Sequence, residues 1–257
     1  MIEINEISVQ IDQKDLVRNC SAQFASSSLT AIVGQNGSGK STLLKSISGL
    51  ITPTHGSVRY NGKNLQRFSV DQLALKRAVF SQGNHNSFPF TVEDLVAMGR
   101  SPHFKKTVAK TDRYIVDECI DLLELNEIRN RNILTLSGGE QQRAHIARVI
   151  AQLYDQDPAE SVYIFDEPTN NLDVYYQYKI MHLLADLRNK GFTILVALHD
   201  LNLVSEFADQ VIVMKNGEIY RHGSADDVLN NSLLSEVYQQ TVHLSKHPER
   251  NHQLIIY

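Results

Sequence analysis

The stretch "AIVGQNGSGKSTLLKSI", residues 31–47, decides the fold. It contains the pattern G-x-x-x-x-G-K-[ST] from Gly34 to Ser41, between an apolar strand-like run and a helical segment. In that context the glycines turn backbone N–H groups toward phosphate oxygens, and the helix N-terminus adds partial positive charge. Lys40 can neutralise the β and γ phosphates, while Ser41 can ligate Mg²⁺. The alternative is a tight glycine turn, but the strand-to-helix context favours a nucleotide site.

Length and composition restrict the remaining classes. The chain has 257 residues, 42% hydrophobic and 21% charged, so we expect one large α/β domain or a core with a subsidiary lobe. A net charge of -4 argues against nucleic acid as the main partner. Cys20 and Cys119 have no metal-site spacing, which favours a reduced compartment. We expect neither a signal peptide nor a membrane span, because the apolar runs are only strand-sized.

The order of periodic segments predicts an α/β fold. Strand-like runs before Gln82 mix antiparallel and parallel character, and "SVYIFDEP" and "FTILVALHD" read as buried strands of a parallel sheet. Helical spacing dominates residues 91–136, with Thr91 as an N-cap and Gly99 as a stop. We therefore predict one domain over residues 1–257. Its α/β core covers residues 1–85 and 155–257, and a helical subdomain covers about 86–154.

Two adjacent carboxylates follow the apolar strand "VYIF". At the C-terminal end of a strand the chain is turning, so Asp166 and Glu167 can address different parts of one site. We expect Asp166 to serve Mg²⁺, and Glu167 to polarise the attacking water as general base. An isolated Asp-Glu pair is usually a solvated strand end, but the phosphate loop favours the catalytic interpretation.

Two further polar residues follow strands at the same edge. His199 ends "VALHD", and a strand beside that of Asp166 would place it near the γ-phosphate. Gln82 ends "AVFSQ" and could contact Mg²⁺ or the water. A lone histidine is more often structural, so this assignment depends on the two strands being neighbours.

A second glycine-containing helix start lies in "LSGGEQQR", residues 136–143. Ser137 and Glu140 fit a capping box, which does not explain Gly138 and Gly139. Glycine costs up to about 1 kcal/mol relative to alanine inside a helix, and close approach of a ligand is one reason to accept it. This stretch lacks a lysine, so it suits a phosphate that is neutralised elsewhere.

Together these motifs resemble the nucleotide-binding subunit of an ABC transporter, over nearly the whole chain. The resemblance implies a P-loop NTPase core of the ABC ATPase type, with a mixed sheet, an antiparallel β subdomain and a helical subdomain inserted between Gln82 and the signature "LSGGE". It implies Glu167 as the base and His199 as the γ-phosphate switch. It implies Mg²⁺ at Ser41, Gln82 and Asp166. The ATP-binding residues would be Gly34, Gln35, Asn36, Gly37, Ser38, Gly39, Lys40, Ser41 and Thr42.

The resemblance also implies an assembly. In this family two subunits pack head to tail, and the signature of one covers the ATP held by the other. We therefore expect a homodimer in which Asp173 contacts the opposing subunit. Two transmembrane permease subunits and, indirectly, a substrate-binding protein would complete the transporter. This chain would lie peripherally on the cytoplasmic face of the inner membrane. The signature residues that face the partner's ATP would be Ser137, Gly138, Gly139 and Glu140.

Less specific sequence patterns resemble one subgroup of ABC transporters. "FPFTVEDLVAMGRSPH" resembles importers of iron chelates, haem and vitamin B12, and the spacer "YDQDPAES" and the C-terminal stretch resemble haem (hemin) import subunits. A siderophore or vitamin B12 importer is the alternative. A soluble ATPase of translation or DNA maintenance would usually bring a second nucleotide domain or a long coiled coil, and this sequence has neither.

Four features leave questions for the structure. Ile11 stands where many relatives have an adenine-stacking aromatic residue, and Asn170 and Asn171 replace a more common small pair. Phe88 and Phe90 either line a groove for a permease helix or pack the helical subdomain against the core. The C-terminal histidines are expected in a polar turn between two strands, with no role as haem ligands; they are His243, His247 and His252.

Overall fold

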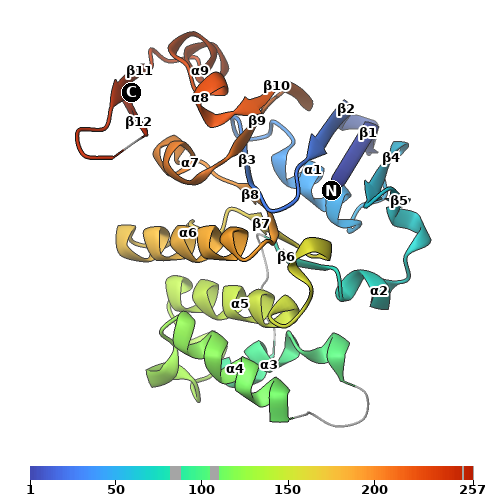
Figure 1. The fold of residues 1–257 in the computed structure, drawn as a ribbon, viewed down its shortest axis with the longest axis vertical. Coiled ribbons are helices and arrows are strands. Elements are labelled where there is room, and N and C mark those ends of the chain that lie inside the picture. Colours follow the sequence, from blue (N-terminus) through green and yellow to red (C-terminus); the bar gives the residue numbers. More distant parts are fainter. Residues whose placement is uncertain (82–87, 105–109, 251, 257) are drawn as a thin grey trace.

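The computed structural model describes residues 1–81, 88–104, 110–250 and 252–256. Its centre is a six-stranded mixed sheet in which all neighbouring strands are parallel except β10, which is antiparallel to β9 (Figure 1). Strands β3, β7 and β8 are buried along their whole length, as expected of continuous apolar runs. In spatial order the strands are β10 (Glu218–Ser224), β9 (Gln210–Lys215), β3 (Leu29–Val33), β8 (Thr193–Ala197), β7 (Val162–Asp166) and β6 (Arg77–Phe80).

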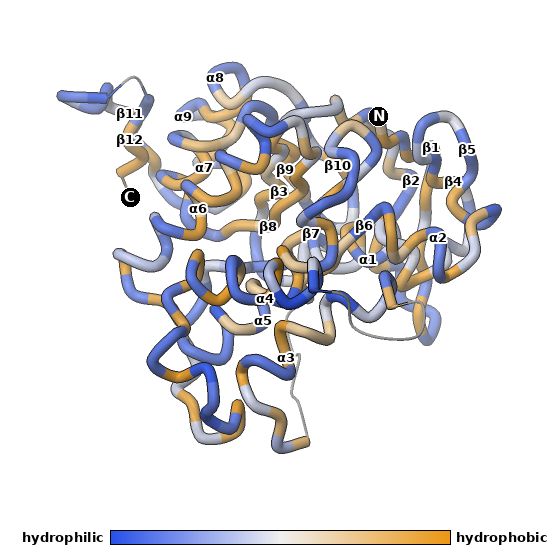
Figure 2. Tube along the Cα trace, turned by 60° about the horizontal axis from the view of Figure 1, so that its bottom comes forward, coloured by the Kyte–Doolittle hydropathy of each residue, from blue (hydrophilic) through white to orange (hydrophobic). Residues whose placement is uncertain are grey.

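Helices cover both faces of this sheet. On one face α1 (Lys40–Ser48) packs with the antiparallel subdomain, and on the other α5 (Gly138–Leu153), α6 (Val174–Asn189) and α7 (Leu201–Phe207) form the larger apolar cluster. Figure 2 shows the hydrophobic colour concentrated along the central strands. The inner strands β3, β8 and β7 are therefore buried, and polar side chains become accessible where they end, whereas the edge strand β10 exposes side chains along its length.

The antiparallel subdomain has the order β2-β1-β4-β5. Strand β2 was not predicted from the sequence, because its buried residues Val17, Cys20 and Phe24 recur at spacings of three and four. Register shifts in the pairing with β1 interrupt the alternation of faces and produce this helix-like spacing. The four strands are β1 (Ile2–Ile11), β2 (Lys14–Phe24), β4 (His55–Tyr60) and β5 (Lys63–Asn64).

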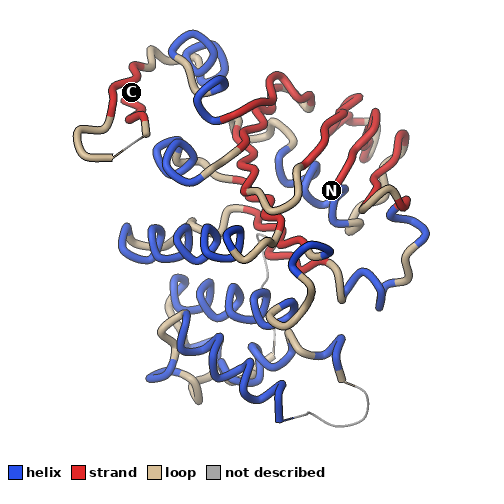
Figure 3. The backbone as a smooth tube through the Cα atoms, in the orientation of Figure 1, coloured by secondary structure: helices blue, strands red, loops and turns tan. Residues whose placement is uncertain are grey.

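A helical group lies between β6 and β7 in the chain and forms the lower part of Figures 1 and 3. It contains α3 (Val92–Met98), α4 (Lys110–Leu122) and α5. Thr91 caps α3 in a capping box and Gly99 ends it, as predicted. The predicted fold class is confirmed; the domain boundaries within the chain stay a prediction.

The C-terminal part adds an antiparallel pair, β11 (His243–Lys246) and β12 (Gln253–Ile256), beside α7. The predicted strand pair is therefore present, but His243 lies in β11 and not in the turn. Among the helices that the structure describes, none has the length and apolarity to cross a bilayer. The remaining elements are α2 (Val70–Ala74), α8 (Ala225–Val228), α9 (Asn231–Tyr238) and the 3₁₀ turns Leu65–Arg67, Ser101–His103, Asn126–Ile128, Ile133–Thr135 and Pro158–Glu160.

Candidate functional site

The loop between β3 and α1 needs glycine for two reasons. Gly34 has φ 147° and Gly39 has φ 103°, both in the region that side chains other than glycine rarely adopt. A Cβ on Gly34 would also lie 2.2 Å from the Met214 carbonyl oxygen, and one on Gly39 would lie 2.7 Å from that of Leu16. The loop is thus packed against both the β9 end and the β1–β2 hairpin, and α1 begins directly after it.

Lys40, the first residue of α1, turns back over this loop. Its Nζ donates to the carbonyl oxygens of Gly34 at 2.9 Å and Gln35 at 3.2 Å, and the residue is buried. Burial lowers the pKa of the Lys40 ammonium, and the charges of Glu167 and Asp166 oppose that shift. The ammonium is therefore held over the loop at the edge where the two carboxylates lie.

Ser41 and Asp166 form one unit. The Ser41 hydroxyl donates to Asp166 Oδ1 at 2.9 Å, which joins the start of α1 to the end of β7. Burial raises the pKa of the Asp166 carboxyl, and the hydrogen bond from Ser41 opposes this. A hydroxyl and a carboxylate side by side are the oxygen donors that Mg²⁺ prefers when substrate phosphates and water complete its shell. Within the described ranges no group of three or more His, Cys, Asp and Glu residues could hold a metal ion. A metal at Ser41 and Asp166 would therefore need phosphate oxygens and water as further ligands.

Glu167 turns away from the strand direction of Asp166. Its φ is 57°, a left-handed conformation for a residue with a side chain, and its N–H donates to the Ala197 carbonyl on β8. Such strain occurs where the surrounding structure over-determines the backbone, often at functional sites. The two carboxylates therefore point to different parts of one region, as their position at a strand end predicts.

His199 lies beside Glu167. Strands β7 and β8 are parallel neighbours, as the sequence assignment of His199 required. The His199 Nε2 is 2.5 Å from Glu167 Oε1, and 38% of the histidine side chain is exposed against 9% for the glutamate. The imidazole is thus partly accessible beside a nearly buried carboxylate.

Asn170 is a site residue that sequence reasoning missed. Its Nδ2 donates to Glu167 Oε2 at 2.5 Å, so each oxygen of the Glu167 carboxylate has a side-chain partner. The sequence had marked Asn170 only as an unusual residue of "NNLD". The useful signal would have been its position three residues after Glu167, which a turn brings within reach.

The signature contains the predicted capping box. The Ser137 hydroxyl and N–H both donate to Glu140 Oε2, at 2.8 and 2.7 Å, and Ser137 Oγ accepts from the Glu140 N–H. These bonds lower the pKa of the Glu140 carboxyl. Gly138 is exposed, and a Cβ built on it meets no atom within 4 Å in the described structure. Steric crowding by the described residues of this chain therefore does not explain why position 138 is a glycine.

The other signature glycine faces its own chain. A Cβ on Gly139 would lie 3.3 Å from the Asn171 carbonyl oxygen, and the Gln142 side chain donates to the Pro168 carbonyl. The start of α5 thus packs on the loop that follows Glu167. In the part of the chain that the structure describes, no hydrogen bond joins the signature to residues 34–42.

The remaining predicted residues have distinct positions. Asp173 is exposed and caps α6 by accepting from the Tyr176 N–H at 2.9 Å. Ile11 is 45% exposed at the end of β1. Gln82 lies outside the described residues. The structure places Gln35, Asn36, Gly37 and Ser38 in the loop and Thr42 in the first turn of α1.

Comparison with known proteins agrees with this arrangement. Residues 17–170 match the ABC transporter family model. A hemin import ATP-binding protein HmuV of Escherichia coli O157:H7 is 35% identical over 257 residues, which cover 100% of this chain and 99% of the relative. The HmuV of Rhodopseudomonas palustris strain HaA2 is 40% identical over 225 residues, 87% of this chain and 84% of the relative.

Solved structures contain the same fold. A dimeric ATP-binding cassette, MJ0796, in a post-hydrolysis state with ADP and Pi is 28% identical, with a TM-score of 0.76 over 88% of this chain and 99% of that one. The phosphate loop, the carboxylate pair after β7 and the signature helix are all present here in one chain. The chain therefore belongs to the ABC transporter family, as an ATP-binding subunit that hydrolyses ATP.

Proposed function

We propose that this chain is the ATPase subunit of an importer that takes up haem (hemin). The geometric support is the linked set at the ends of β7 and β8, where Glu167 contacts His199 beside the Ser41–Asp166 pair. The support for haem is the two relatives that are named as hemin import ATP-binding proteins and match most of the chain. The resemblance of the spacer "YDQDPAES" and the C-terminal stretch to haem import subunits points in the same direction.

In this proposal the loop holds the ATP phosphates. Lys40 and the amides of residues 34–42 neutralise and orient them, and Ser41, Asp166 and Gln82 hold Mg²⁺. Bound Mg²⁺ would supply positive charge to the β and γ phosphate oxygens. The existing Ser41–Asp166 bond brings two of its ligands together before any ion arrives, which supports this assignment.

Glu167 polarises the attacking water in the proposed mechanism, and His199 contacts the γ-phosphate. The nearly buried carboxylate holds one oxygen toward His199 and the other toward Asn170, so its orientation is set before water binds. His199 in turn is oriented by Glu167 and is partly accessible for contact with the phosphate. Asn170 acts as a positioning residue for the base.

Two copies pack head to tail in the proposed working unit. Ser137, Gly138, Gly139 and Glu140 of one copy would cover the ATP of the other, and Asp173 would contact the opposing subunit. The open space at Gly138 supports this, as does the exposure of Asp173. A relative of the same family, MJ0796, forms a dimer with ADP and Pi bound.

The proposed membrane partners are two permease subunits, with a substrate-binding protein acting through them. The subunit would sit peripherally on the cytoplasmic face of the inner membrane, with no nucleic-acid partner. Phe88 is 66% exposed and its ring centroid lies 6.0 Å from that of the half-buried Phe90. That exposure favours docking of a permease helix over packing against the core for Phe88.

Reconstitution tests the proposal. The chain is purified with its permease, placed in lipid nanodiscs with the substrate-binding protein, and assayed for ATPase activity with hemin, a ferric siderophore or vitamin B12. We expect stimulation by hemin, and none in a Glu167→Gln complex. Stimulation by a siderophore or vitamin B12 alone would overturn the haem assignment. Saturable binding to ribosomes or DNA without any membrane partner would overturn transport itself.

A further inference from the structure

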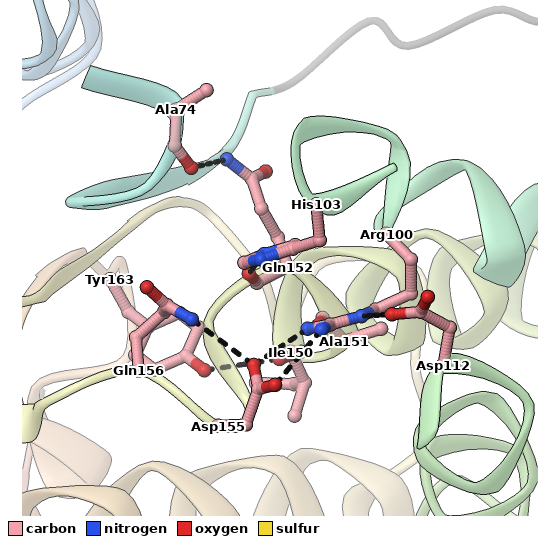
Figure 4. A network of polar contacts seen from close by, with 10 residues as sticks. All are labelled: Ala74, Arg100, His103, Asp112, Ile150, Ala151, Gln152, Asp155, Gln156 and Tyr163. Carbon is pink, nitrogen blue, oxygen red and sulfur yellow. Dashed lines mark hydrogen bonds and ion pairs between the residues drawn. The ribbon is translucent and has the colours of Figure 1, made fainter. Parts of the chain in front are cut away.

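The C-terminal end of α5, the signature helix, is capped by groups from other elements. Helix ends leave carbonyl groups without intrahelical donors, and a left-handed glycine often satisfies them. Here the C-cap residue Tyr154 is right-handed helical, so no such motif forms. Three side chains from elsewhere in the chain donate to carbonyl oxygens of the final turn instead (Figure 4). The bonds are Tyr163 Oη to Ile150 O at 3.1 Å, Arg100 Nη1 to Ala151 O at 2.7 Å, and His103 Nε2 to Gln152 O at 2.7 Å. The N–H of Gln156, just beyond the helix, adds a local bond to Leu153 O at 3.1 Å.

Arg100 is the centre of this cap. Its side chain is only 2% exposed, and Nε donates to Asp112 Oδ1 at 3.0 Å on α4. The two Nη atoms donate to the two oxygens of Asp155 at 2.9 and 3.1 Å, a fork that lysine cannot reproduce. The guanidinium also lies where a helix dipole favours positive charge. One buried side chain therefore joins α3, α4 and the end of α5.

Gly99 explains how Arg100 reaches this position. A Cβ at Gly99 would lie 2.2 Å from the Arg148 carbonyl oxygen on α5, so the two chain segments cross at a distance that only glycine permits. The next residue then projects to the end of α5. "MGRSPH", which resembles the wider importer group, and the spacer "YDQDPAES", which resembles haem import subunits, thus meet through Arg100 and Asp155.

The same helix end is attached to the α/β core. The Gln152 side-chain amide donates to the carbonyl oxygens of Ala74 at 2.7 Å and Arg77 at 3.0 Å. Arg77 begins β6, the central-sheet strand whose continuation in the sequence is Gln82. The C-terminal end of α5 is therefore fixed to both subdomains. Its N-terminal end, which carries the signature, has separate contacts: Gln142 donates to the Pro168 carbonyl, and Arg143 donates to the Leu123 and Glu124 carbonyls.

The length of α5 amplifies any tilt about its C-terminal end, a tilt that the contacts of Gln142 and Arg143 near the signature oppose. With 16 residues and about 1.5 Å rise per residue the helix is about 24 Å long, so a tilt of about 5° moves the signature by about 2 Å. Misplacement by about 1 Å costs reactions about 100-fold when it affects groups at the chemistry. A small change in the angle of α5 at its C-terminal end would thus produce a larger displacement of the signature.

We propose that Arg100 is a positioning residue for the signature motif, acting through the capped end of α5. The proposal rests on the proposed dimeric function, because the signature acts on the partner's ATP. Arg100 contacts neither ATP nor the reacting atoms; it sets the angle at which Ser137 and Gly138 meet the other subunit. Its loss weakens ATP-driven closure of the dimer and leaves the phosphate loop of each copy intact.

ATP-dependent dimerisation in a Glu167→Gln background, which prevents hydrolysis, tests this. The variants are Arg100→Lys, which keeps the charge but not the fork, and Asp155→Asn, which alters the half-exposed end of the same contact. Analytical ultracentrifugation gives the ATP concentration for half-maximal dimer, and a fluorescent ATP analogue gives the Kd of the monomer. We expect the ATP concentration for half-maximal dimer to rise about tenfold, and the monomer Kd to stay unchanged.

Arg129→Lys is the matched control, because Arg129 pairs with Glu93 and Asp117 in the same helical subdomain away from the end of α5. It should dimerise like the background at a comparable thermal stability. Dimerisation of folded Arg100→Lys and Asp155→Asn at the background ATP concentration would overturn the inference; if Arg100→Lys does not fold, Asp155→Asn decides. Failure of the background itself to dimerise would instead overturn the proposed dimer.

Discussion

The Nε2 of His199 lies 2.5 Å from Oε1 of Glu167, which joins the polar ends of the neighbouring strands β7 and β8. The Asn170 Nδ2 donates to the other carboxylate oxygen, Glu167 Oε2, at 2.5 Å. The carboxylate is thus oriented on both sides, at an edge of the sheet where the phosphate loop also ends. This arrangement gives Glu167 and its neighbours separable roles that substitution can test.

Glu167→Gln removes the proposed base and keeps the side-chain size. We expect kcat to fall by about 10²–10⁴-fold, because general base catalysis contributes that much. ATP binding should persist, since Lys40 and the loop are untouched. Steady-state ATPase kinetics with equilibrium ATP binding check both parts, and near-normal turnover would exclude Glu167 as the base.

Asn170→Ala removes one hydrogen bond to the Glu167 carboxylate. A hydrogen bond to a charged group contributes about 1.5–3 kcal/mol, so we expect kcat to fall about tenfold or more. The Kd for ATP should not change, because Asn170 does not belong to the phosphate loop. Undiminished kcat in a folded Asn170→Ala variant would argue against a role for Asn170.

Asp166→Asn should stabilise the nucleotide-free chain while abolishing hydrolysis. Burial raises the folded-state pKa of Asp166 above its unfolded value, so the folded state binds more protons above about pH 3.8. The charged carboxylate therefore costs stability in full above the raised pKa, and nothing below about pH 3.8.

The measurement for Asp166→Asn is thermal unfolding against pH. The variant should have the higher Tm at pH 7, by about 2–4 °C for each kcal/mol in a chain of this size, and the difference should vanish in acid. A lower Tm for Asp166→Asn at pH 7 would show that the Ser41 hydrogen bond to the charged form outweighs burial.

Gly138→Ala separates the role of the signature from folding. The position is helical and open, so alanine should leave stability unchanged or raise it by up to about 1 kcal/mol. ATPase activity should nevertheless fall sharply, because the added methyl would meet the partner's nucleotide. Unfolding in denaturant and ATPase assays on the same preparation check this, and full activity would mean that nothing approaches Gly138.

The sequence predicted the parts of the site that depend on strand ends. Runs such as "VYIF" and "ILVA" are buried strands, and parallel neighbours bring Asp166, Glu167 and His199 to one edge. Strand β2 was missed because its register shifts break the alternation of faces.

The contacts that the sequence could not supply depend on tertiary geometry. Asn170 contacts Glu167 across a turn in which the Glu167 backbone is left-handed, a conformation that no local preference for glutamate predicts. Arg100 in "MGRSPH" was recognised as part of a typical pattern, but its partners Asp112, Ala151 and Asp155 lie 12 to 55 residues away. Burial of a charged fork is decided by packing of three helices, which spacing alone does not encode.

Subunit mixing tests the central claim, that the signature of one copy serves the ATP of the other. Lys40→Ala and Gly138→Ala chains are each assayed for ATPase activity alone and after mixing. If the signature acts on the partner, a mixed dimer contains one site with an intact loop and an intact signature, and mixing restores hydrolysis above either variant alone. If the signature instead acts on the ATP of its own chain, every site in the mixed dimer keeps one defect. A mixture that is no more active than either variant alone would therefore contradict the account.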